Sequence, residues 1–491
     1  MNRVTVNADA GEAKISKHIY GQFAESPGGV IYGGLWVGPD SSVPNTRGFR
    51  NNVIEALRAI KMPNLRWPGG GYAEHYHWRD GVGSRDKRPD GTYKLNGGYR
   101  EFDVGTHEFM ELCELVGCEP YMCCNTITGT PEEAVEWVRY LTADDDSAPA
   151  KLRRVNGRQK PWQSRMWAIG NEGWAYSDMP EPYTKRYLEY ADAMAEAAGG
   201  ELLRVACGPG GMRYDWTDVV MRTVGHCTEG LAFHHYTLAG FWNDKGDALD
   251  FDEARYGVTM RNTICIEDLI NKHSLIMDKY DPEKRVALVM DEWGTWYDSS
   301  KLPDGSASPY QQGTMRDAMV AATMLNMFNN HCQRVRICNL AMIINGLHPI
   351  IIIDPNDGMF FTPTYHVFEM FTPHMEATML PVVVTADRYD PAGYTFPGVN
   401  ASASHDSSGR MHLTLTNIDI NKDREVLVDF HGTNVKGAAG RVLRGEKIQS
   451  HNTADEPEAV KPVEFSDTKV QDGWLKVQLP SMSVVVLEVE E

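Results

Sequence analysis

Short apolar runs alternate with longer amphipathic segments from about residue 18 to residue 372, and this alternation constrains the fold more than any other feature. The apolar runs indicate β-strands and the amphipathic segments α-helices, and eight strand–helix pairs fit into this stretch. Strands that alternate with helices lie parallel, and eight of them close into a ring. The sequence therefore predicts a (β/α)8 barrel (TIM barrel), with an open doubly wound sheet as the competing fold.

The pattern changes after about residue 376. Segments such as MHLTLTNID and REVLVDFHG alternate with a period of two and are bounded by Gly, Asn, Asp and Pro, which is typical of an all-β antiparallel sandwich of the jelly-roll kind. The opening MNRVTVNAD alternates in the same way. We therefore expect a catalytic barrel over residues 16–375 and a C-terminal sandwich over 376–491, joined by a strand from residues 1–15.

The charge and the composition of the chain exclude several classes of function. The 67 acidic residues outnumber the 48 Lys and Arg, which gives a net charge of −19 without any basic stripe. Such a surface repels nucleic acids and anionic polymers, so a neutral substrate fits best. No apolar run approaches the ~20 residues that span a bilayer, and no secretory signal is recognisable. Nine cysteines, an odd number without a C-x-x-C pair, indicate buried reduced thiols in a cytoplasmic protein rather than a zinc site.

Polar residues follow the apolar runs at the expected carboxyl ends of the barrel strands, which is where barrel enzymes place their active sites. Most of them are neutral or acidic, with one arginine and neighbouring tryptophans, as suits a pocket for a neutral polyol. His234 and His235 are adjacent in a strand, so only one of them can face the mouth. The strand-end residues are Glu25, Arg66, Asn125, Asn171 with Glu172, His234 to Tyr236, and Asp291 with Glu292.

Two glutamates among these residues indicate a reaction. Glu172 ends the run MWAIGNE and Glu292 ends ALVMDE, so both should project into the barrel mouth. Glycoside hydrolysis requires two carboxyl groups, one on each side of the scissile bond. A salt bridge at the rim would explain either glutamate alone, but it explains the pair less well. The tryptophans near the strand ends, Trp296 among them, suit a carbohydrate cleft, although each is also an ordinary packing residue.

Several motifs of the chain resemble those of a known family. The motifs LRWPGG, GTHEF, AIGNE, MDEWGTWY and TPTYHVFEMF together resemble glycoside hydrolase family 51, the α-L-arabinofuranosidases, and the likeness runs through nearly the whole chain. The resemblance implies a retaining double displacement without metal or cofactor, with Glu172 as acid/base and Glu292 as nucleophile. It further implies a homo-oligomer, a hexamer or trimer. The substrate-binding residues that it suggests are Glu25, Arg66, Asn125, Asn171, which should bind the sugar 2-OH, His234, Tyr236, Trp296 and His348.

The chain departs from the family pattern around the pocket. His235 stands at a family tyrosine, His348 stands where a pocket glutamine is expected, and the loop after Glu172 is shorter. The reaction class is therefore better defined than the sugar. A β-D-galactofuranosidase, a β-D-xylosidase, an endo-β-glucanase and a non-catalytic sugar-binding protein remain as alternatives.

The sequence thus predicts a cytoplasmic exo-glycosidase that removes terminal non-reducing α-L-arabinofuranosyl residues from neutral arabino-oligosaccharides derived from hemicellulose. Glu292 attacks the anomeric carbon while ionised beside Arg66, and Glu172 protonates the leaving oxygen. A retaining mechanism places the two carboxyl groups ~5–5.5 Å apart, whereas a separation beyond ~6.5 Å would favour inversion.

Overall fold

Eight parallel strands close into a barrel in the computed structural model, which describes residues 2–11, 13–26, 29–91, 98–199, 202–298, 311–354 and 356–491. Around the barrel the strands follow the order β10, β11, β2, β5, β6, β7, β8, β9. This closed ring confirms the predicted (β/α)8 architecture over the open sheet. The strands are β2 (Gly21–Phe23), β5 (Asn64–Trp67), β6 (Glu119–Cys124), β7 (Met166–Ile169), β8 (Leu203–Ala206), β9 (Gly230–Thr237), β10 (Ala287–Thr295) and β11 (Val335–Ala341).

Helices surround the barrel and begin where the sequence supplies capping residues. The Thr130 hydroxyl accepts a hydrogen bond from the amide of Glu133, and Pro131 opens the helix, as its start signals predict. No helix within the described ranges is long and apolar enough to cross a membrane. The main helices are α1 (Asn51–Ala59), α2 (Thr106–Val116), α3 (Pro131–Thr142), α6 (Glu181–Ala197), α7 (Tyr214–Val224), α8 (Glu253–Tyr280), α9 (Met315–Asn330) and α10 (Pro363–Met370).

Some element boundaries differ from the sequence-based expectation. The helix expected near residues 263–280 already begins at Glu253, because the Asp252 carboxylate caps it by accepting the amide of Arg255. The first strand, expected over residues 18–25, is a 3-10 turn (Lys17–Tyr20) followed by the short β2. Two short helices were not expected, α4 (Ala148–Val155) and α5 (Gly173–Tyr176).

The C-terminal part forms two sheets. The N-terminal strand β1 lies inside the five-stranded sheet, in the order β15, β1, β20, β24, β23, and the other sheet has the order β14, β18, β19, β25, β21, β22. Because β1 runs parallel to β20, the sandwich is not purely antiparallel as predicted. The strands are β1 (Asn2–Asn7), β14 (Thr378–Leu380), β15 (Val382–Thr385), β18 (Val399–His405), β19 (Met411–Asn417), β20 (Arg424–His431), β21 (Gly437–Arg444), β22 (Val463–Phe465), β23 (Thr468–Gln471), β24 (Trp474–Leu479) and β25 (Ser483–Glu490).

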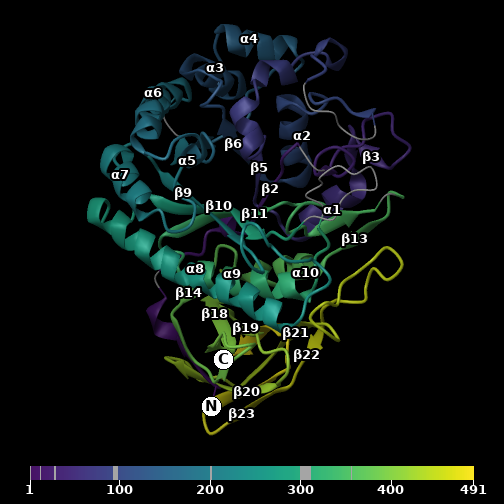
Figure 1. Ribbon diagram of the computed structural model, residues 1–491, viewed down its shortest axis with the longest axis vertical. Coiled ribbons are helices and arrows are strands. Elements are labelled where there is room, and N and C mark those ends of the chain that lie inside the picture. Colours follow the sequence, from purple (N-terminus) through teal and green to yellow (C-terminus); the bar gives the residue numbers. More distant parts are fainter. Residues whose placement is uncertain are drawn as a thin grey trace.

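Helix α9 connects the two parts of the molecule. Figure 1 shows α9 between the barrel above and strands β18 and β19 below, with both chain termini at the sandwich end. The Ser402 hydroxyl donates to Asn326 Oδ1 at 2.7 Å, and Asn329 Nδ2 donates back to Ser402 at 3.3 Å. Every α9 residue from Met315 to Asn329 is buried. The helix therefore packs on the barrel and the sandwich at once.

All nine cysteines are free. Seven of them are buried, Cys227 is partly buried and Cys265 is exposed. Burial raises the pKa of Cys207 and Cys332 to about 12, so these thiols stay protonated and unreactive at neutral pH. Most of the cysteines therefore act as small core residues, as their sequence positions indicate.

Candidate active site

The two predicted catalytic glutamates meet at the carboxyl ends of β7 and β10. One carboxylate oxygen of Glu172 and one of Glu292 lie within 4.8 Å of each other. This limit for the two nearest oxygens agrees with the ~5–5.5 Å between the carboxyl groups of retaining glycosidases, whereas inverting ones hold them ~6.5–9.5 Å apart to admit a water molecule. Glu172 itself has a left-handed backbone (φ 46°, ψ 50°), which is uncommon for a residue with a side chain and is typical of functional sites.

Arg66 of β5 orients Glu292. Its side chain is 1% exposed, and its Nη1 donates to Glu292 Oε1 at 2.7 Å while Nη2 donates to Asn171 Oδ1 at 2.7 Å. The Tyr236 hydroxyl donates to the other oxygen, Glu292 Oε2, at 2.9 Å. Both Glu292 oxygens are therefore held by donors that fix the carboxylate in one orientation.

Asn171 keeps one group available for substrate. Its Oδ1 accepts from Arg66, whereas its Nδ2 has no hydrogen-bond partner among the residues that the structure describes. The amide nitrogen is thereby defined as the free end of the side chain, since the oxygen is engaged. Asn171 can thus donate to a sugar hydroxyl beside Glu172, the role that the resemblance implies.

His234 of β9 links the carboxylates. Its Nδ1 lies 2.8 Å from Glu172 Oε1, and its Nε2 lies 3.2 Å from Asp291 Oδ1. Burial by itself would lower the histidine pKa, but Glu292, Asp291 and Glu172 outweigh burial and raise the pKa to about 10. The ring is therefore a cation at neutral pH, with Nδ1 hydrogen-bonded to Glu172 and Nε2 in an ion pair with Asp291. His235 points the other way, with Nε2 at 3.2 Å from the Asn262 carbonyl, as strand geometry predicts.

Asp291 belongs to the site, although the sequence did not single it out as a binding residue. Consecutive strand residues normally face opposite sides, but the register of β10 against β11 shifts between Met290 and Trp293. This irregularity lets Asp291 and Glu292 both point into the barrel. Asp291 accepts from the Tyr121 hydroxyl at 2.8 Å and lies 3.4 Å from Arg66 Nε. Burial opposes its ionisation, yet Arg66 and His234 outweigh burial and lower the Asp291 pKa.

Glu74 is a second residue that sequence reasoning missed. It is fully buried after the glycine-rich turn of β5, and its carboxylate accepts the amides of Asn171 at 2.6 Å and Thr126 at 2.6 Å. A Cβ at Gly170, which has φ +83°, would lie 2.9 Å from Glu74 Oε1 and 2.5 Å from the Thr126 hydroxyl. The glycine of the AIGNE motif therefore lets the chain pass over Glu74 and turn Glu172 into the mouth. The only feature of the sequence that could have indicated Glu74 is its position as an acidic residue shortly after the glycine-rich turn.

Glu25 and the aromatic residues complete the predicted pocket. The amide of Tyr72 donates to Glu25 Oε1 at 2.8 Å, and burial together with nearby Glu292 raises the Glu25 pKa to about 7. Trp296 packs edge-on against Tyr236, with ring centroids 5.1 Å apart, and against Trp242 at 5.4 Å. A row of aromatic rings thus runs from Glu292 to Trp242, which is 62% exposed.

Two predicted substrate-binding residues, Asn125 and His348, form hydrogen bonds with neighbouring parts of the protein. The Asn125 oxygen accepts the amides of its own loop, from Thr128 at 2.9 Å and Gly129 at 2.9 Å, and its nitrogen donates to the Thr128 hydroxyl at 2.8 Å. His348 is 0% exposed, with Nδ1 accepting the amide of Thr295 and Nε2 3.0 Å from the Thr364 hydroxyl. His348 is therefore closed off from the pocket surface, whereas the substrate-binding role of Asn125, which is 7% exposed, stays a prediction.

The site also contains donor atoms suited to a metal ion. Glu172, His234 and Glu292 each place one such atom within 4.8 Å of the others. However, Arg66 and the protonated His234 already supply positive charge there, at 2.7 and 2.8 Å from the carboxylates. A metal ion would have to displace these contacts and overcome like-charge repulsion. The donor set fits carboxylates held by fixed cations better than it fits a metal centre.

Comparisons with known proteins agree with this geometry. The family model for the alpha-L-arabinofuranosidase 1 domain matches residues 56–237, and that for the alpha-L-arabinofuranosidase C-terminal domain matches residues 291–483. The chain is 42% identical to an intracellular exo-alpha-L-arabinofuranosidase of Bacteroides ovatus, over 99% of this chain and 95% of the relative.

Solved structures show the same likeness. The GH51 arabinofuranosidase of Xanthomonas axonopodis pv. citri superposes with a TM-score of 0.94 at 40% identity, covering all of both chains. The α-L-arabinofuranosidase of Thermotoga maritima, solved as an arabinose complex, superposes with a TM-score of 0.84 at 27% identity, again over all of both chains. On this combined likeness in sequence and structure, the chain belongs to the α-L-arabinofuranosidases of glycoside hydrolase family 51.

Proposed function

We propose that the protein is a retaining exo-α-L-arabinofuranosidase that releases terminal non-reducing arabinofuranosyl residues from neutral arabino-oligosaccharides. The observation that carries this proposal is the pair Glu172 and Glu292, with carboxylate oxygens within 4.8 Å at the barrel mouth. Full-length relatives named as arabinofuranosidases, one of them as an exo-enzyme, support the sugar and the mode of cleavage.

The reaction follows from the positions of these two groups. Glu292, oriented by Arg66 and Tyr236, attacks the anomeric carbon while Glu172 gives its proton to the departing glycosidic oxygen. Water then enters from the side of Glu172, which takes its proton as the water cleaves the glycosyl–Glu292 ester. Two inversions at the same carbon give net retention. Asn171 Nδ2 donates to the sugar 2-OH beside the reacting centre.

Hydrolysis of p-nitrophenyl α-L-arabinofuranoside tests the proposal. We expect the wild-type protein to turn over this substrate and Glu292→Gln to lose about 10⁴-fold or more in kcat, since the amide cannot form the ester. Proton NMR of the first-formed sugar should show the α-anomer. Turnover that survives in Glu292→Gln, or a β-anomer as the first product, would contradict the mechanism. A silent wild type would contradict the sugar assignment.

The proposal also covers the cellular location and the oligomeric state of the protein. We infer a cytoplasmic location, supported by the Bacteroides ovatus relative that is named intracellular and by the free cysteines. We also infer a homo-oligomer, a hexamer or trimer, from the family resemblance. Light scattering coupled to size-exclusion chromatography tests the second point, because a mass of about 55 kDa, that of a single chain, would contradict it.

A further inference from the structure

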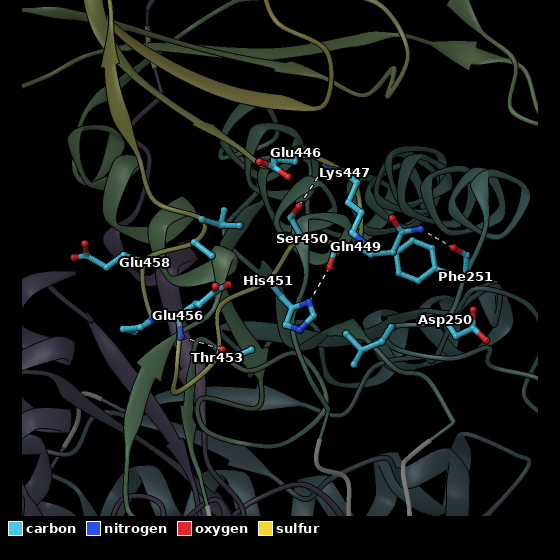
Figure 2. Close-up of a pocket in the computed structure, with 14 residues that line it drawn as sticks. Asp250, Phe251, Glu446, Lys447, Gln449, Ser450, His451, Thr453, Glu456 and Glu458 are labelled. Carbon is cyan, nitrogen blue, oxygen red and sulfur yellow. Dashed lines mark hydrogen bonds between the residues drawn. The ribbon is translucent and has the colours of Figure 1, made fainter.

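A large cavity lies where the sandwich meets the rim of the barrel. It has a volume of about 1220 Å³ and is formed by the β9–α8 loop and the β21–β22 loop, with Leu249 and Phe251 from the former and Lys447, Gln449, His451 and Thr453 from the latter. Figure 2 shows the His451 ring in the middle of these side chains. We call it the junction cavity.

One loop runs from the barrel mouth to the junction cavity. The β9–α8 loop carries Trp242 at the mouth and Leu249 at the cavity, seven residues apart, so their Cα atoms are at most about 25 Å apart. Arg316 of α9 holds the stretch between them, because its Nη2 donates to the carbonyls of Asp247 at 2.9 Å and Ala248 at 3.1 Å. A chain leaving the active site past Trp242 can therefore follow this loop to the cavity.

The wall contributed by the sandwich is preformed. The fully buried Asn452 donates to the carbonyls of Phe361 at 2.9 Å and Val460 at 3.0 Å, and Gln449 Nε2 donates to the Phe251 carbonyl at 2.7 Å. The Ser450 carbonyl accepts the amide of Met315, the first residue of α9. A ligand would thus meet a fixed surface and would not have to order the loop.

The lining suits a neutral, hydroxyl-rich ligand. His451 Nδ1 is bound to the Gln449 carbonyl at 2.8 Å, while its Nε2 has no partner within the described part of the chain. The exposed Lys447 adds a donor. The carboxylates of Asp250, Glu446, Glu456 and Glu458 accept hydrogen bonds and repel anions. Side chains that both donate and accept, next to the apolar Leu249, are the composition that a sugar chain requires.

We propose that the junction cavity binds the leaving-group portion of the substrate, a neutral oligosaccharide chain that extends from the arabinofuranosyl branch past Trp242. This role rests on the proposed function. It gives the sandwich a direct part in substrate selection, since an exo-enzyme that encloses only one sugar in its active site can recognise the rest of the chain only outside it.

Chain-length kinetics test this inference. The substrates are p-nitrophenyl α-L-arabinofuranoside, which is too short to reach the cavity, and β-1,4-xylo-oligosaccharides of increasing length with one terminal arabinofuranosyl branch. The variants are His451→Ala and the exposed Lys447→Ala, with His431→Ala as the control. His431 is an exposed histidine at the end of β20, outside the cavity.

We expect kcat/KM of the wild type and of His431→Ala to rise with chain length. His451→Ala and Lys447→Ala should each lose about threefold to tenfold on the longest substrate, the effect of a lost hydrogen bond, with the aryl substrate unchanged. Calorimetric titration with the unbranched oligosaccharide should show weaker binding to His451→Ala than to His431→Ala. Equal losses on both substrates, or no loss in either cavity variant, would overturn the inference. A wild type that cleaves neither substrate would overturn the proposed function itself.

Discussion

At the scale of single residues, the charge on His234 should be visible in the stability of the protein. The folded-state pKa is raised from 6.5 to about 10, so its stabilising contribution is complete below pH 6.5 and is lost as the pH rises towards 10. We expect His234→Gln to be less stable than the wild type by about 3 kcal/mol at pH 6, because the buried carboxylates lose their cation. Urea denaturation at several pH values should show this difference shrinking between pH 6.5 and 10. A difference independent of pH would contradict a cationic histidine.

The raised pKa of Glu25 should also make the protein less stable as the pH rises, but over a lower pH interval than that of His234. The Glu25 pKa is raised from 4.5 to about 7 by burial and by Glu292, so the folded protein loses stability as the pH rises through this interval. Glu25→Gln can still accept the Tyr72 amide but has no charge to bury. We expect the melting temperature of the variant, relative to the wild type, to be higher at pH 8 than at pH 5. Glu464→Gln, at an exposed position, is the control. If the melting temperatures of Glu25→Gln and the wild type differ by the same amount at pH 5 and pH 8, the raised pKa of Glu25 is contradicted.

That Glu172 and Glu292 meet at the barrel mouth was predictable from sequence, whereas the residues that hold them were not. Glu172 and Glu292 each end an apolar strand, and that position alone directs them to the mouth. Asp291 joins them only because β10 breaks its register, which no local pattern in the sequence reveals. The burial of His348 was not predictable for a related reason, since its partners Thr295 and Thr364 come from other segments and meet it only in the folded barrel.

At the scale of the element, the start of α9 should matter for activity as well as for stability. Asp317 is fully buried, accepts the Thr314 amide as part of the helix cap, and also accepts the hydroxyls of Thr295 at 2.7 Å and Tyr297 at 3.2 Å. Those two residues flank Trp296, the aromatic wall of the mouth. The Asp317 carboxylate therefore joins the start of α9 to the end of β10.

We expect Asp317→Ala to lose about 3 kcal/mol of stability, because several buried donors lose their acceptor, and to lower kcat/KM on a branched oligosaccharide as Trp296 shifts. Thr314→Ala removes the cap hydroxyl, which accepts the Arg316 amide and donates to Asp317, but leaves the Asp317 contacts with Thr295 and Tyr297; it should cost about 1 kcal/mol with activity retained. Urea denaturation and steady-state kinetics on both variants make the comparison. Equal effects of the two substitutions on activity would show that Asp317 acts on the helix only.

The bounds of helices and strands were predictable where residues close in the sequence define them. Helix α3 begins at its threonine cap and proline, as its sequence requires. By contrast, β2 is shorter than its apolar run, since its ladder to β11 ends at Phe23 and residues Lys17–Tyr20 curl into a turn. The parallel pairing of β1 with β20 depends on two ends of the chain that meet only in the folded molecule, so alternation alone could not predict its direction.

At the scale of the whole molecule, the six-stranded sheet is covered on both faces. Along β25, Val485 and Leu487 belong to the core inside the sandwich, whereas Val484 and Val486 belong to the apolar core that continues through α9 into the barrel. This explains why the run SVVVLEV is apolar at successive positions instead of alternating. The sequence divides the chain into two parts at about residue 376, but the packing joins them through one shared layer.

Because of this shared layer, the two parts should unfold together. Differential scanning calorimetry should show a single transition whose calorimetric and van't Hoff enthalpies agree, although chains of this size often unfold in steps. Val485→Ala opens a cavity inside the sandwich only and should cost about 2 kcal/mol. If unfolding is cooperative, this variant also lowers the temperature at which arabinofuranosidase activity is lost, although Val485 lies outside the barrel. Two transitions, with activity lost at the wild-type temperature, would show that the barrel stands without the sandwich.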